Sequence, residues 1–171
     1  MSNDATIAES RETGTSETDR FYRAYGRAML SWQLVETALF RFYFGLFTGG
    51  NLNQVGSAYY SLNSFGAKLH LVSATAPAIL RGDQRRAWTA ILRDLKTGAE
   101  DRNILAHRAV AIAADGGSEL ALVLAPPYFA PKHLRRKLGV RYDAAACDRL
   151  AEAFEALAGR IDGLCAACSA S

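Results

Sequence analysis

Apolar residues recur with a helical period over most of the chain. The longest such stretch, residues 18–47, is apolar on nearly every side, and the pair Gly49-Gly50 follows it. A helix that is apolar all round packs on more than one side. We therefore expect this helix at the centre of the fold or partly against a second subunit. Residues 1–17 are polar and poor in large apolar side chains, so they are predicted to form a disordered tail.

Four further helical segments are predicted from apolar spacing and from residues that can cap helices. Pro77 is expected to kink or interrupt the second of them. The segments are a short helical or irregular piece at 51–62, a helix that begins after Asn63 or Ser64 and ends at Gly82, a helix over 84–107 after Asp83, and a last helix from Asp143 to about Ala167.

Between the last two helices the pattern changes from helical to alternating. Residues 108–114 and 119–125 read as two short strands, and the sequence Asp-Gly-Gly-Ser between them is a hairpin turn signal. The predicted fold is therefore mainly α, a helical bundle with a small β-hairpin inserted before the last helix. A chain of 171 residues has the length of one domain, so residues 18–171 are expected to form a single domain, with the hairpin and a basic loop at about 108–141.

Composition and charge indicate which partners and which cellular compartment suit this protein. The net charge is +3, which suits an acidic or nucleic-acid partner without being diagnostic. Residues 29–47 are strongly apolar but include Gln33, Glu36 and Arg41, which favours a buried helix over a membrane span. We see no secretory signal at the start of the chain, and an odd cysteine count points to a reducing compartment, so a cytoplasmic protein is expected. The C-x-x-C pair at 165–168 lacks the further ligands of a zinc site, and no metal or cofactor is expected.

The densest set of groups capable of chemistry closes the helix over 84–107. It contains Arg102, Asn103 and His107. At about 100° per residue, Asn103 and His107 lie on one side, whereas Arg102 lies roughly 140° around the helix from His107. Arg102 and His107 can both reach one phosphate only if the last turn is distorted or if a second copy of the helix faces the first.

These three residue types suit phosphodiester cleavage without a metal. The chain has no Gly-rich phosphate loop, no G-x-S-x-G elbow and no H-E-x-x-H pair. Histidine can take a proton from a ribose 2′-hydroxyl or give one to a leaving 5′-oxygen. Arginine can hold the phosphate oxygens as negative charge builds, and asparagine can orient either group. A 2′-hydroxyl nucleophile implies RNA rather than DNA.

The segment Arg102-Asn103-Ile104-Leu105-Ala106-His107 resembles the R-x(4–6)-H motif of the HEPN superfamily, the higher eukaryotes and prokaryotes nucleotide-binding domains. The likeness covers residues 18–107 and the last helix. It implies a helical bundle, a homodimer and, in many members, a metal-independent endoribonuclease whose Arg and His come from both subunits. Arg102 and His107 match the catalytic pair and Asn103 the polar position. Toxin members have a neutralising partner protein, so a toxin–antitoxin or defence role is a further expectation.

Other interpretations remain open. The chain can be a catalytically silent HEPN-like dimer that binds RNA, nucleotide or a partner protein, or a DNA-binding regulator. Arg102 and His107 can also simply stabilise a helix C-terminus, where the helix dipole favours cations.

Two further sets of residues are candidates for supporting roles. Glu36 shares the apolar face of the first helix, so it either has a partner or reaches water past its neighbours. Arg102 and His107 are the favoured partners, and Arg41 and Arg85 are rivals. The loop after the hairpin is basic, with no acidic residue among its charges, and is either an RNA-phosphate surface or a solvated loop. Its candidate RNA-binding residues are Lys132, Arg135, Arg136, Lys137 and Arg141.

Overall fold

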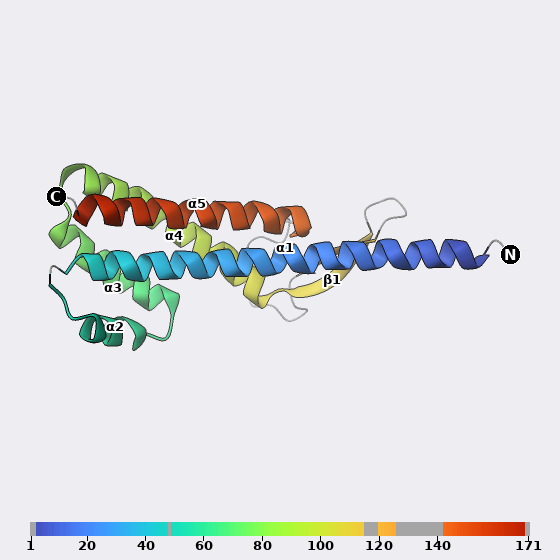
Figure 1. Ribbon diagram of the computed structural model, residues 1–171, viewed down its shortest axis with the longest axis horizontal. Coiled ribbons are helices and arrows are strands. Elements are labelled where there is room, and N and C mark those ends of the chain that lie inside the picture. The colour runs from blue at the N-terminus through green and yellow to red at the C-terminus, as the bar shows by residue number, and fades with distance from the viewer. Residues whose placement is uncertain (1–2, 48, 115–119, 126–141, 170–171) are drawn as a thin grey trace. The chain divides into compact units, whose positions relative to one another are not determined.

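The computed structural model describes residues 3–47, 49–114, 120–125 and 142–169. In this part of the chain the fold is mainly α, with one small antiparallel hairpin before the last helix, as the sequence predicted (Figure 1). The elements are α1 (Asn3–Gly45), α2 (Leu52–Tyr60), α3 (Phe65–Ile79), α4 (Gly82–His107), β1 (Ala109–Ala114), β2 (Leu120–Ala125) and α5 (Ala144–Ser169).

The residues group into two compact units. Unit 1 comprises Met1–Leu30 and Asp101–Glu152, and unit 2 comprises Ser31–Glu100 and Ala153–Ser171. The helices α1, α4 and α5 each contribute residues to both units. Each unit is compact by itself. The expectation that residues 18–171 form a single domain therefore stays a prediction.

The start of α1 differs from the sequence prediction. The helix begins at Asn3, whereas a disordered tail was expected over residues 1–17 and a helix only from Thr18. Lengthening an existing helix by one residue requires no new nucleus, which is the unfavourable step in helix formation. A polar segment can therefore continue a helix that its neighbouring apolar residues have already established.

Unit 2 is a helical bundle with an aromatic core. Trp32 of α1 packs edge-on against Phe65 of α3 and Phe154 of α5, with ring centres 4.7 and 5.1 Å away. Phe42 of α1 stacks on Trp88 of α4 at 4.9 Å. Gly98 of α4 is buried beside the Trp32 ring, and a Cβ at that position would lie only 3.1 Å from the ring. The aromatic stripe of α1 thus joins three other helices, which explains why that helix is apolar on several sides.

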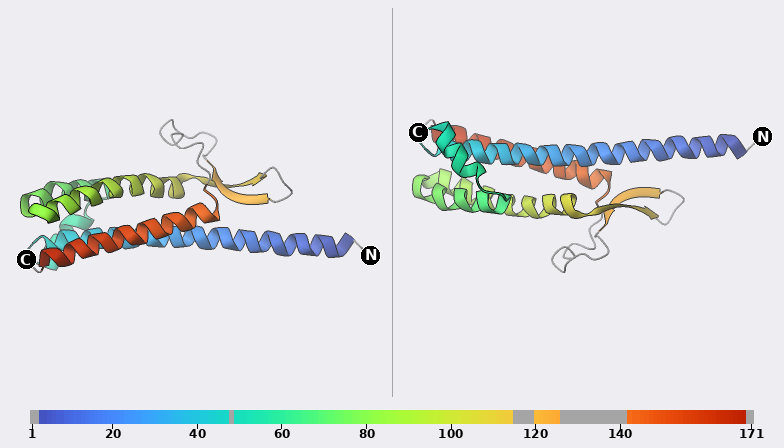
Figure 2. Two further views of the ribbon diagram at one scale, coloured as in Figure 1. Left: turned by 90° about the horizontal axis from the view of Figure 1, so that it is seen from above. Right: turned by 90° about the horizontal axis from the view of Figure 1, so that it is seen from below.

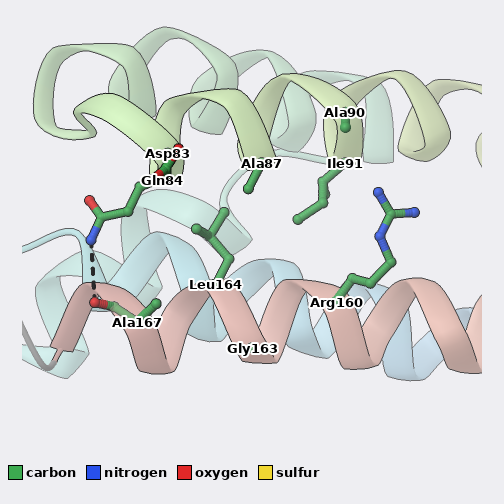
Figure 3. A pocket seen from close by; sticks show the side chains of 9 residues that line it. All are labelled: Asp83, Gln84, Ala87, Ala90, Ile91, Arg160, Gly163, Leu164 and Ala167. Atoms are coloured by element: carbon green, nitrogen blue, oxygen red, sulfur yellow. Dashed lines mark hydrogen bonds between the residues drawn. The ribbon is translucent and has the colours of Figure 1, made fainter.

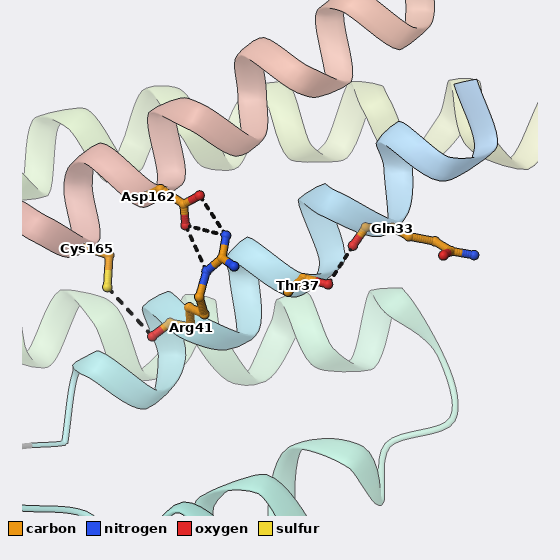
Figure 4. A network of polar contacts seen from close by, with 5 residues as sticks. All are labelled: Gln33, Thr37, Arg41, Asp162 and Cys165. Carbon is orange, nitrogen blue, oxygen red and sulfur yellow. Dashed lines mark hydrogen bonds and ion pairs between the residues drawn. The ribbon is translucent and has the colours of Figure 1, made fainter. Parts of the chain in front are cut away.

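Polar contacts tie α1 to α5 within the same unit (Figure 4). Arg41 forms a bidentate ion pair with Asp162, with Nη2 2.7 Å from Oδ2 and Nε 3.1 Å from Oδ1. The Cys165 thiol donates to the Arg41 carbonyl at 3.7 Å, and the buried Ser31 hydroxyl donates to Glu155 at 2.9 Å. Because both side chains of the Arg41–Asp162 pair are about half exposed, the pair contributes little to the stability of the fold.

The ends of α3 show how local sequence sets the helix bounds. Ser64 caps the first turn by accepting from the Ala67 amide at 3.1 Å, as expected. Pro77 does not interrupt the helix, which continues to Ile79. A proline in the last turn removes a single backbone bond close to the point where the helix ends anyway. Gly82 has a φ of +49° and begins α4, two residues before the predicted start.

Unit 1 contains the hairpin and the start of α5. The strands β1 and β2 form an antiparallel hairpin (Figure 2). In its ladder, Ala109 lies opposite Ala125 and Ile112 opposite Leu122. The amide of Leu124 in β2 also donates to the carbonyl of Tyr142 at 3.0 Å. Asp143, the next residue, caps α5 as predicted.

Within the described residues, no helix is both long and apolar enough to cross a bilayer.

Candidate functional site

The last turn of α4, in unit 1, is regular. The Arg108 amide donates to the Ile104 carbonyl at 3.1 Å, which continues the α-helical bonding pattern past His107. Of the two ways in which Arg102 and His107 could address one phosphate, a distorted turn is therefore absent from this chain. The two side chains leave the helix roughly 140° apart, and the facing second copy stays a prediction.

Burial divides this segment into an inner and an outer face. Ile104 and Leu105 are buried, whereas Asn103 and His107 are exposed and Arg102 is half-buried. The apolar pair anchors the helix end in unit 1 and leaves the three candidate residues on the outer side. The structure therefore brings Asn103 close to Arg102 but does not bring His107 to the same point.

Arg102 has a single polar partner among the described residues. Its Nη1 donates to Asn103 Oδ1 at 3.2 Å, it makes no ion pair there, and its buried Nε has no hydrogen-bond partner. A guanidinium without a carboxylate keeps the charge and the N–H groups that a phosphate requires. Asn103 limits the directions that this guanidinium can adopt.

A tyrosine that the sequence analysis did not single out lies against this helix end. The Tyr142 hydroxyl donates to Asp101 Oδ1 at 3.3 Å, and the Arg108 guanidinium carbon lies 5.0 Å from the centre of its ring. Burial, followed by the charge of Asp101, raises the pKa of Tyr142 to about 12. Tyr25 of α1 donates to the Leu105 carbonyl at 3.3 Å. No local sequence pattern predicts either contact, because the partners are 41 and 80 residues apart along the chain.

Glu36 lies in unit 2 and has a partner that was not anticipated. It accepts a hydrogen bond from Trp32 Nε1 at 2.7 Å, one helical turn away. Of the rival cations, Arg41 is engaged with Asp162. Burial and the Glu36 charge together raise the pKa of Tyr59 well above its usual range. The pairing of Glu36 with Arg102 or His107, which belong to unit 1, stays a prediction.

Replacing Glu36 with Leu is expected to lower the free energy of unfolding by about 1–3 kcal/mol, because the buried Trp32 indole N–H loses its acceptor. Glu36→Gln keeps an acceptor and should cost less. Urea unfolding measures both, with Gln33→Leu on the exposed side of α1 as the control. Equal stability of the Leu and Gln variants would contradict the role given to the Trp32 bond, and unchanged RNA cleavage by the Gln variant would contradict a pairing with Arg102 or His107.

The basic residues of the predicted RNA surface, Lys132, Arg135, Arg136, Lys137 and Arg141, lie outside the described residues. Their role stays a prediction.

Among the described residues, no group of three or more His, Cys, Asp or Glu side chains could hold a metal ion. Cys147 is fully buried, and burial followed by the charges of Asp143 and Asp148 raises its pKa to about 11.

A separate groove in unit 2 runs between α4 and α5 (Figure 3). Its volume is about 380 Å³, and its walls include Ala87, Ile91 and Leu164. At one end Gln84 donates to the Ala167 carbonyl at 3.2 Å. None of the candidate site residues predicted from the sequence lines this groove, and its walls are mostly small or apolar.

The chemistry available at the end of α4 is thus a guanidinium, an amide and an imidazole on the outer face of a regular helix. A guanidinium and an amide can bind an anionic oxygen, and an imidazole can give or take a proton. Any functional assignment depends on these residues themselves, because no family model, curated protein or solved structure matches this chain.

Proposed function

We propose that this protein is a metal-independent endoribonuclease of the HEPN type, with Arg102 and His107 from two subunits meeting in a composite site. The observation that carries the proposal is the regular last turn of α4. It presents Arg102 and His107 outward in directions roughly 140° apart, so one copy of the helix supplies only part of a site. A two-fold arrangement of two copies places the Arg102 side of one helix against the His107 side of the other.

In the proposed reaction, a neutral His107 takes the proton from the ribose 2′-hydroxyl. The 2′-oxygen attacks the adjacent phosphorus, the bond to the 5′-oxygen breaks, and a 2′,3′-cyclic phosphate forms. The same imidazole, which the first step has protonated, then gives a proton to the leaving 5′-oxygen. Arg102 stabilises the extra negative charge on the phosphate oxygens, and Asn103 keeps the guanidinium oriented.

A second subunit would cover apolar side chains that α1 exposes. Leu30 is 64% exposed, and Leu34 is 53% exposed. In the cell, the proposed enzyme acts on RNA in the cytoplasm, within a toxin–antitoxin or defence system, and a neutralising partner protein would restrain it.

One observation favours a second candidate function, a catalytically silent dimer that binds RNA, nucleotide or a partner protein. Arg102 already donates to Asn103 in its own chain, and His107 lies in the last turn of α4, where a cation is favourable for stability alone. In that case the same side chains bind an anion without moving a proton.

Cleavage in EDTA separates the two functions. The purified protein should cut structured or unstructured RNA in the chelator and leave 2′,3′-cyclic phosphate ends, since the proposed reaction uses no metal and its nucleophile is the 2′-hydroxyl rather than water. An RNA of the same sequence with 2′-O-methyl groups is the matched control and should stay intact. Binding of both RNAs without cleavage supports the silent module, and cutting of the methylated RNA would contradict the proposed mechanism.

A further inference from the structure

We propose that Tyr142 is a positioning residue for the end of α4: it holds the two residues that flank the Arg102–His107 segment and thereby fixes the directions in which Arg102 and His107 face. This inference deepens the proposed function and rests on it for its catalytic consequence.

The two flanking residues lie on one side of the helix. Asp101 and Arg108 are seven positions apart, which is about two turns, so they emerge within roughly 20° of each other. Tyr142 contacts both: its hydroxyl donates to Asp101 Oδ1 at 3.3 Å, and its ring centre lies 5.0 Å from the guanidinium carbon of Arg108. A single side chain therefore contacts the helix just before Arg102 and just after His107.

Tyr142 is itself firmly held. Its side chain is almost completely buried, and its carbonyl accepts from the Leu124 amide of β2 at 3.0 Å. Asp143, which follows directly, caps α5 through the Ala146 amide at 2.8 Å. The raised pKa keeps the hydroxyl protonated, and hence a donor, throughout the neutral range. Tyr142 thus ties the end of α4 to both the hairpin and the start of α5.

A helix end needs such support because its last carbonyl groups lack partners within the helix, and terminal turns fray. His107 is the last residue of α4, so fraying changes the direction of its imidazole directly. Misplacement of a reacting group lowers the rate of the chemical step without removing the charges that bind substrate. The role expected of Tyr142 is therefore a contribution to kcat rather than to RNA affinity.

The test uses Tyr142→Phe, which removes the hydroxyl and keeps the ring. We expect kcat for RNA cleavage to fall roughly ten-fold, with KM changed less than about two-fold. Amide hydrogen exchange at residues 104–108 should become faster. Tyr22→Phe is the matched control, because Tyr22 is a half-exposed tyrosine of the same unit whose hydroxyl makes no hydrogen bond to the described residues.

Unchanged exchange at residues 104–108 in Tyr142→Phe would overturn the positioning role, whatever the RNA assay gives. Faster exchange with an unchanged kcat in an active enzyme would also overturn it, because the helix end would then move without affecting the reaction. If the unmodified protein cuts no RNA, the proposed function fails on its own, and the exchange measurement still decides whether Tyr142 orders this helix end.

Discussion

A mixture of the Arg102→Ala and His107→Ala variants is expected to recover RNA cleavage that neither variant shows alone. Each substitution by itself should lower kcat by about 10²–10⁴-fold, the range for loss of a proton-transfer or charge-stabilising group. In a composite site, a mixed dimer combines the intact Arg102 of one chain with the intact His107 of the other. With random exchange of subunits, half of the dimers are mixed and each has one complete site, so about one quarter of the original activity should return.

The control replaces His107→Ala in the mixture with the Arg102→Ala/His107→Ala double variant, which leaves no complete site in any dimer. Light scattering should report twice the chain mass for every variant, and circular dichroism should show unchanged helicity. A mixture that exchanges subunits and stays inactive would show that Arg102 and His107 do not act across subunits in this way. A monomer mass for the unmodified protein would remove the composite site altogether.

Replacing Trp32 with Ala is expected to be among the most destabilising single changes in unit 2. The side chain is 1% exposed, packs against Phe65 and Phe154, and donates to Glu36. Truncating a buried tryptophan costs about 3–5 kcal/mol, because contacts are lost and a cavity remains. For a chain of this length, the loss corresponds to a fall in Tm of about 6–20 °C.

Differential scanning calorimetry measures this change. Gln33→Ala, the next residue along α1, is the matched control, because its side chain is exposed and the change should alter the free energy of unfolding by no more than about 0.5 kcal/mol. A Tm for Trp32→Ala within the range of this control would contradict the placement of the indole at the meeting point of α1, α3 and α5.

The secondary structure could be predicted from the sequence because its signals are local. Ser64 and Asp143 each precede an apolar periodic stretch, and each accepts the expected hydrogen bond from the first turn of its helix. The change to strict alternation after His107 likewise predicts the hairpin. The start of α1 could not be predicted in this way, because the propagation of an established helix into a polar segment leaves no apolar pattern.

The candidate site could be predicted only in part. The spacing of Arg102, Asn103 and His107 gives their directions on a regular helix, and the structure has a regular helix there. The contact of Tyr142 with Asp101 depends on the path of the hairpin, which brings together residues 41 positions apart. Trp32 lies one turn before Glu36, so helical spacing allows its indole N–H to donate to the carboxylate, whereas the apolar surroundings of Glu36 favour a cation as its predicted partner.

Because Cys147 is buried, its reaction with a thiol reagent can be followed separately from the reactions of the cysteines in unit 2. Its thiol is fully buried in unit 1, whereas Cys165 and Cys168 are partly exposed in unit 2. A thiol reagent can reach Cys147 only when its surroundings open, and its raised pKa keeps the reactive thiolate scarce in the closed form. The rate at which Cys147 is labelled therefore reports the local opening equilibrium around the start of α5, close to the tyrosine that supports the proposed site.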